Sequence, residues 1–240
     1  MVYCSVVAIA DNIALVRERI ESAARRAARN PQSLTLMAVS KTISVDRIRE
    51  AYEAGIRLFG ENRVQEFGAK SEQFRSLRDA QVHMIGHLQS NKAAHATELF
   101  DAIDSVDSFR LAQKLNAAAS ALGKTLPVLI EVNIGGEAAK SGIAPDSGEL
   151  LRIFDAIGGL SSIEVRGLMT VPPYDDDPEK SRPYFRKMRV LLEELAGQNR
   201  HLATLSMGMS HDFEVAIEEG STCVRVGTAI FGKRLVANRQ

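Results

Sequence analysis

Lys41 stands at a point in the sequence where its amine could lie inside a buried core. Lys41 comes just after the apolar run of residues 36–39, so its stem would start at the mouth of that core. Burial disfavours the charged ammonium and lowers its pKa, and a neutral lysine amine is a nucleophile toward aldehydes. The position alone leaves open an ordinary lysine that points outward from the end of a strand.

Two turns of small residues could bind an anion. The first contains Ser206, Gly208 and Ser210 and leads from an apolar run into a helical pattern. Such a turn aims backbone N–H groups and hydroxyls at one point, as phosphate sites at helix N-termini do. The second, Gly227-Thr228, follows the last apolar run and would add another backbone approach and a hydroxyl. Tight turns that need glycine only for packing are the alternative.

Arg225 lies two residues before Gly227, so both would project from the same face of one strand. An arginine inside a folded core needs a partner, because a buried unpaired charge is costly. That partner is either an acceptor on a ligand or a buried glutamate such as Glu131.

Short apolar runs alternate with helical patterns along the chain, and several runs are apolar on consecutive residues, as in parallel strands buried on both faces. We predict strands at residues 34–39, 57–60, 82–86, 100–103, 128–134, 163–169, 203–207 and 222–226. Helices are predicted at residues 8–29, 44–54, 64–77, 91–99, 107–122, 146–157, 179–196 and 212–219.

This alternation predicts a single α/β domain over residues 1–240, a (β/α)₈ TIM barrel with an added N-terminal helix. The 240 residues are close to the roughly 250 typical of this fold. A doubly wound open sheet would alternate too, but it usually has fewer strands. Barrels do their chemistry at the C-terminal ends of the strands, and their phosphate sites often use the loops after the last two. Lys41 and both turns fall at such ends.

An amine and a phosphate site at one mouth would suit an aldehyde that also carries a phosphate. A sugar phosphate, as in Schiff-base aldolases, and pyridoxal 5′-phosphate (PLP) both meet this description. The spacing of the residues does not separate the two.

Seven segments carry a more specific signal. They are Ala38-Val39-Ser40-Lys41-Thr42; Phe59-Gly60-Glu61-Asn62 with Val64-Gln65-Glu66; His83-Met84-Ile85-Gly86-His87-Leu88-Gln89-Ser90-Asn91-Lys92; Val132-Asn133-Ile134 with Lys140-Ser141-Gly142; Arg166-Gly167-Leu168-Met169; Ser206-Met207-Gly208-Met209-Ser210; and Arg225-Val226-Gly227-Thr228-Ala229-Ile230-Phe231-Gly232. In this order they resemble the pyridoxal phosphate homeostasis protein family. The resemblance implies an alanine-racemase-like barrel of fold type III that binds PLP, with no second β domain.

By this resemblance, Lys41 is the lysine that forms the internal aldimine with PLP, and Arg225 faces the pyridine nitrogen. Asn62 lies in a motif near the cofactor, and His83 lies beneath it, either as a contact or as a packed core histidine. The residues on the phosphate-binding turns are Ser206, Gly208, Met209, Ser210, Gly227 and Thr228. Arg63 stands where the family typically has a tyrosine, which affects only the open rim.

The residue on the pyridine nitrogen decides how strongly PLP would stabilise a carbanion. An acidic residue keeps that nitrogen protonated, whereas Arg225 only donates and would leave the electron sink weak. Racemisation also needs a base on each face of the substrate, and Lys41 could serve one face only. The tyrosines, none at a predicted strand end, are Tyr3, Tyr52, Tyr174 and Tyr184.

We therefore expect a monomeric protein that holds and releases PLP in vitamin B6 homeostasis and amino-acid balance, without robust catalysis. Apo PLP enzymes are the expected acceptors. A PLP-dependent amino-acid racemase, with Lys41 as a catalytic base, and a cofactor-independent aldolase are the alternatives. Lys140, in a loop at the barrel mouth, is a further candidate that could receive the cofactor transiently on its way in or out.

Composition argues against other classes of function. The 30 basic and 30 acidic residues balance, whereas binding nucleic acid through a basic face needs an excess of Lys and Arg. No apolar stretch approaches the roughly 18 residues of a membrane span, and no signal peptide is evident, so a cytoplasmic protein is expected. We expect no metal: the cysteines and histidines lack ligand spacing, and Asp175-Asp176-Asp177 fits a solvated loop.

Overall fold

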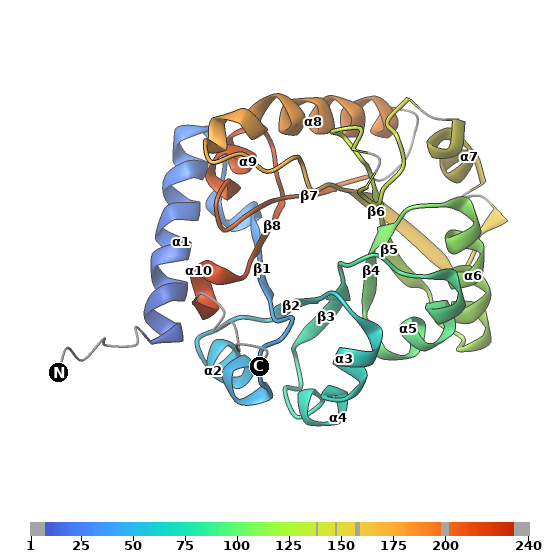
Figure 1. Cartoon of the computed structure of the whole chain (residues 1–240), viewed down its shortest axis with the longest axis horizontal. Helices are drawn as coiled ribbons and strands as arrows, with labels where there is room; N and C mark the ends of the chain where they lie inside the picture. Colours follow the sequence, from blue (N-terminus) through green and yellow to red (C-terminus); the bar gives the residue numbers. More distant parts are fainter. Residues whose placement is uncertain (1–7, 138, 147, 157–158, 198–201, 233–240) are drawn as a thin grey trace, which may run out of the picture.

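Eight parallel strands form a closed barrel in chain order (Figure 1). The computed structural model describes residues 8–137, 139–146, 148–156, 159–197 and 202–232. The strands are β1 (Thr35–Val39), β2 (Leu58–Glu61), β3 (Gln81–Met84), β4 (Ala102–Val106), β5 (Leu126–Glu131), β6 (Ile163–Met169), β7 (Thr204–Met209) and β8 (Cys223–Val226). The register Met37↔Arg225 between β1 and β8 closes the ring.

The helices surround this barrel. They are α1 (Ile9–Arg26), α2 (Val45–Glu53), α3 (Val64–Gly68), α4 (Ser71–Phe74), α5 (Ala93–Leu99), α6 (Phe109–Ala121), α7 (Gly148–Ala156), α8 (Arg182–Ala196), α9 (Phe213–Glu218) and α10 (Thr228–Phe231), with short 3₁₀ segments η1 (Pro31–Ser33), η2 (Ser90–Lys92) and η4 (Pro178–Ser181). The predicted TIM barrel and its added N-terminal helix are confirmed. Within the described residues, no second β domain accompanies the barrel.

Most element bounds differ from the sequence predictions by up to three residues; β5, for example, was predicted at 128–134 and is observed at Leu126–Glu131. The helix predicted at 64–77 is two helices, α3 and α4, and the short helix α10 after Gly227 was not predicted. The strand predicted at 100–103 was placed too early, because β4 begins at Ala102. Phe100 is buried instead in an aromatic cluster, with its ring centroid 5.0 Å from that of Phe67. Its apolar character therefore serves helix packing and does not mark the start of a strand.

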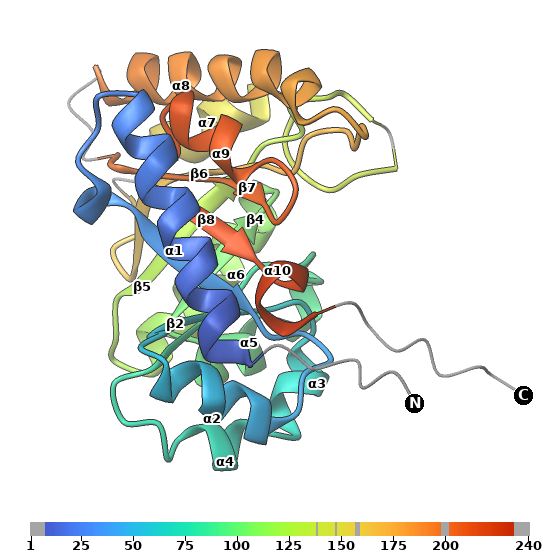
Figure 2. The ribbon, with the colours of Figure 1, turned by 90° about the vertical axis from the view of Figure 1, so that its left-hand side faces the viewer.

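The N-terminal helix α1 lies across the outside of the barrel, beside α9 and α10 (Figure 2). Its stripe of Ile9, Ile13, Val16 and Ile20 is buried, as the helical spacing predicts. None of the described helices is long and apolar enough to cross a membrane.

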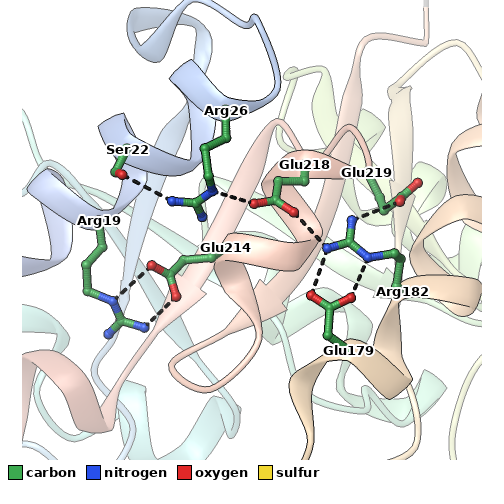
Figure 3. Close-up of polar contacts among 8 residues, drawn as sticks. All are labelled: Arg19, Ser22, Arg26, Glu179, Arg182, Glu214, Glu218 and Glu219. Atoms are coloured by element: carbon green, nitrogen blue, oxygen red, sulfur yellow. Dashed lines mark hydrogen bonds and ion pairs between the residues drawn. The ribbon is translucent and has the colours of Figure 1, made fainter.

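Ion pairs on the outer surface link α1, α9 and the start of α8 (Figure 3). Arg19 pairs with Glu214 at 3.0 Å and Arg26 with Glu218 at 2.8 Å. Glu218 also accepts a hydrogen bond from Arg182, which donates to Glu179 and Glu219 as well. Exposed ion pairs are individually weak, at about 0–1 kcal/mol, but several share partners here. Together they link α9 to α1 and to the start of α8.

Candidate functional site

A cavity of about 280 Å³ lies at the C-terminal ends of the strands. Val39 at the end of β1 and Met209 at the end of β7 mark its position in the barrel. Six of the nine predicted site residues line it: Lys41, Met209, Ser210, Arg225, Gly227 and Thr228. The structure thus brings the amine, both turns and the arginine around one space.

The two predicted anion-binding turns are joined to each other. The Ser210 hydroxyl accepts the backbone N–H of Gly227 at 3.2 Å and that of Ala229 at 3.3 Å. On the other side, the Met209 N–H donates to Asp212 Oδ1 at 2.7 Å. Among the described residues, no partner accepts from the backbone N–H of Ser210 or His211. These two groups remain available to an anion in the cavity.

The two glycines of these turns differ in the space around them. Gly208 has φ +92°, and a Cβ there would lie 2.5 Å from Ala216 Cβ and 2.9 Å from Phe213 Cα. Packing of β7 against α9 therefore requires glycine at 208. At Gly227 the first atom that a Cβ would meet is Val39 Cβ, at 3.4 Å. The packing alternative thus accounts for Gly208, whereas no close backbone contact requires glycine at 227.

Arg225 is buried, with 4% of its surface exposed, and two neutral acceptors hold it. Its Nη1 donates to Ser206 Oγ at 2.7 Å, and its Nη2 donates to the Thr170 carbonyl at 2.8 Å. Burial lowers the pKa of the guanidinium. Ser206 therefore orients Arg225 from inside the barrel and does not line the cavity, and among the described ion pairs none joins Arg225 to Glu131.

Three buried oxygens near the mouth of the barrel have no hydrogen-bond partner among the described residues: Glu61 Oε2, Asn62 Oδ1 and Glu131 Oε2. Burial and the nearby Asp107 raise the pKa of Glu131 to about 7, against the opposing charges of Arg225 and His87. Asn62 does not line the cavity. Unsatisfied buried oxygens are costly and favour a hydrogen-bond donor in their neighbourhood.

His83 lies at the other end of the barrel. It lines a separate cavity of about 360 Å³ bounded by residues at strand starts, such as Thr35, Ala102 and Cys223. Its Nδ1 is 3.1 Å from Asp104 Oδ1. Burial opposes the charged ring, but the Asp104 carboxylate outweighs it and raises the pKa of His83. His83 thus pairs with Asp104 in a different cavity from Lys41.

A tyrosine that was not predicted lies at the mouth. Tyr174, with Pro172 and Pro173, lines the cavity from the loop after β6. Its ring centroid lies 5.7 Å from that of His211, and its hydroxyl bonds Asp176 at 3.1 Å. The residue is five positions beyond β6, so strand ends alone do not indicate it. The only available signal was that a loop after a barrel strand folds over the mouth.

Lys140 lies beside the same loop. Its amine donates to the Pro172 carbonyl at 3.1 Å and pairs with Glu137. It does not line the cavity itself. Among the described residues, no group of three or more His, Cys, Asp or Glu side chains is arranged to hold a metal ion.

Comparison with known proteins places this arrangement in a family. The model of the alanine racemase N-terminal domain matches residues 6–234. A pyridoxal phosphate homeostasis protein of Aquifex aeolicus is 46% identical over 225 residues, covering 93% of this chain and 97% of that protein. The chain belongs to the pyridoxal phosphate homeostasis protein family. The resemblance seen in the seven sequence segments is confirmed.

Solved structures agree with this membership. PipY of Synechococcus elongatus, a structure with PLP bound, matches with a TM-score of 0.82 and 38% identity, over 93% of this chain and all of that chain. An alanine racemase of Clostridium difficile matches with a TM-score of 0.72 at 16% identity, over 95% of this chain and 61% of the racemase. The racemase likeness shows that this member of the homeostasis protein family shares the racemase barrel fold.

Proposed function

We propose that this protein binds PLP at the C-terminal mouth of its barrel and holds and releases it, as part of intracellular PLP homeostasis and amino-acid balance. One observation carries the proposal: Lys41, the two turns and Arg225 line a single cavity. Each of these groups matches a different part of PLP, which has an aldehyde, a phosphate and a pyridine nitrogen.

The donor set fits the cofactor. Lys41 supplies an amine for the aldehyde, and the N–H groups of Ser210 and His211 are available to the phosphate. Arg225 is held by two neutral acceptors, so its charge is not cancelled by an ion pair before a ligand arrives. Asn62 lies outside the lining of this cavity, so its contact with the cofactor stays a prediction.

The same residues argue for storage over catalysis. When bound, PLP supplies an electron sink whose strength depends on a protonated ring nitrogen. Arg225 is fixed as a donor and gives no proton to that nitrogen. Tyr174 lines the mouth, but its bond to Asp176 raises the pKa of its phenol, which keeps the hydroxyl protonated. To act as the second base of racemisation, Tyr174 would have to lose its phenolic proton, which the contact with Asp176 disfavours.

The proposal extends to partners and setting. Apo PLP enzymes are the acceptors, and the protein acts as a monomer in the cytoplasm. Nucleic acid is not a proposed partner, because the 30 basic and 30 acidic residues leave no net excess of positive charge.

A transfer assay tests this function. The PLP-loaded protein is mixed with an apo PLP enzyme, with and without a scavenger of free PLP, and recovery of enzyme activity is followed. We expect recovery in both arms, slower with the scavenger if the cofactor is first released to solution. Incubation of single amino-acid enantiomers with the loaded protein should give no more interconversion than free PLP. Failure of the purified protein to take up PLP would contradict the proposal.

A further inference from the structure

The turn that carries Lys41 is held by three charged side chains that lie outside the cavity. Residues 40–43, here called the lysine turn, connect β1 to α2. Glu61 at the end of β2, Glu66 in α3 and Lys70 just before α4 surround this turn. Glu61 is fully buried, and the Lys70 side chain is 11% exposed. None of the three lines the cavity.

Lys70 contacts both ends of the lysine turn. Its amine donates to the carbonyl of Ser40 at 3.1 Å and to that of Ile43 at 3.4 Å. The same amine lies 2.7 Å from Glu61 Oε1, which accepts the Ser40 hydroxyl at 2.6 Å. One ammonium therefore links the residue before Lys41, the second residue after it, and a buried carboxylate.

The middle of the turn needs this support. Thr42 has φ +63°, a conformation that β-branched residues rarely adopt and that persists only where the surroundings impose it. Its backbone N–H donates to Glu66 Oε1, and Glu66 lies 3.7 Å from the Lys70 amine. Thr42 is thus strained directly beside Lys41, and charged side chains hold it in place. This combination indicates a preorganised turn.

We propose that Lys70 is a positioning residue, which with Glu61 and Glu66 fixes the lysine turn so that Lys41 is directed into the cavity. The effect on cofactor binding rests on the proposed function. The effect on the turn does not, because it is a property of the protein without ligand. Lys70 acts through the backbone on either side of Lys41 and contacts no part of the cavity.

The test compares Lys70→Met with the double variant Glu61→Gln/Lys70→Met. The single variant leaves the Glu61 carboxylate buried without its cation and could fail to fold, whereas the double variant removes both members of the buried Glu61–Lys70 ion pair and leaves only the partly exposed Glu66 charged. Lys92→Met is the matched control, because within the described part of the chain the Lys92 amine bonds only the exposed Gln65 side chain, at 3.2 Å. Hydrogen exchange of the Thr42 and Ile43 amides is measured in the ligand-free proteins, with Ile130 in β5 as the reference amide.

We expect the Thr42 and Ile43 amides of the double variant to exchange at least about tenfold faster, the effect of losing one or two hydrogen bonds, while Ile130 and the Lys92→Met protein stay unchanged. PLP affinity should fall about tenfold, with the same amount bound at saturation. Unchanged exchange at Thr42 and Ile43, or equal acceleration at Ile130, would overturn the inference. Failure of the wild-type protein to bind PLP would instead overturn the proposed function and leave the exchange result standing.

Discussion

The two ends of the barrel both hold a cavity and buried charge, but they use them differently. At the C-terminal end, about 280 Å³ is lined by a lysine, an arginine held by neutral acceptors, and turns with unused backbone N–H groups. At the N-terminal end, about 360 Å³ is lined by charged side chains that already have partners, His83, Asp104 and Arg166. The larger cavity is thus the less suited to bind a ligand.

The N-terminal cavity satisfies its own charges. His83 pairs with Asp104 at 3.1 Å, and Arg166 pairs with Glu164 at 2.8 Å. Cys223 is buried, which raises the pKa of its thiol to about 12 and leaves it unreactive. Unsatisfied donors locate function better than cavity size does, because a ligand must supply what the protein has left unpaired.

Loss of Lys41 should have the largest effect on PLP binding at the C-terminal end. We expect Lys41→Ala to abolish the visible absorption that a protein lysine gives on condensing with PLP, because no other amine lines the cavity among the described residues. Lys140→Ala is the matched control and should keep the band, since that amine lies outside the cavity on the Pro172 carbonyl. Titration of both variants with PLP, followed by absorbance, measures the difference. A band that survives in Lys41→Ala and disappears in Lys140→Ala would reverse the assignment.

Alanine substitutions at Gly208 and Gly227 should distinguish a packing role from a binding role at the C-terminal end. Gly208→Ala should lower the free energy of unfolding by about 2–4 kcal/mol, through overpacking against Phe213 and Ala216 at a positive φ. Gly227→Ala should change stability by less than about 0.5 kcal/mol. Its methyl would narrow the cavity beside Val39 and weaken PLP binding about tenfold. Urea unfolding and PLP titration of both variants test this, and similar stability losses in the two would contradict it.

Glu131 provides a pH-dependent contrast with the paired charges at the other end. Its pKa is raised from 4.5 to about 7 in the fold, so the stability associated with its proton is present at low pH and lost as pH rises through about 7. Each pKa unit is worth about 1.4 kcal/mol, which gives a loss of up to about 3 kcal/mol above that pH. Glu131→Gln should stabilise the apoprotein by up to this amount at about pH 8.5 and little at about pH 5. Equal effects at both pH values would refute the assignment.

The smallest effect is expected at the N-terminal end. Asp104 raises the pKa of His83 above its ordinary value, so the pair stabilises the fold fully below about pH 6.5 and less as pH rises through the folded pKa. His83→Gln should therefore cost about 1 kcal/mol at about pH 5, on the scale of one hydrogen bond, and less at about pH 8. PLP affinity should not change. A loss of PLP binding in this variant would mean that the two ends are coupled.

Much of the fold was predictable, because parallel strands buried on both faces leave apolar runs that the sequence shows directly. The exception at Phe100 arose where helix packing, invisible in one stretch of sequence, buried an aromatic ring. The turns at the strand ends were predictable because barrels often build phosphate sites from the loops after their last two strands. Two features were not predictable, because they depend on contacts between segments far apart in the sequence. Ser206 accepts a hydrogen bond from Arg225 inside the barrel, and the loop that carries Tyr174 folds over the mouth.

We propose that the C-terminal mouth binds PLP through Lys41. The most direct measurement is to load the wild-type protein with PLP, reduce it with borohydride and map the labelled peptide by mass spectrometry. We predict one pyridoxyl group per chain, on Lys41. Label found on Lys140, spread over surface lysines, or absent from the protein would contradict the claim.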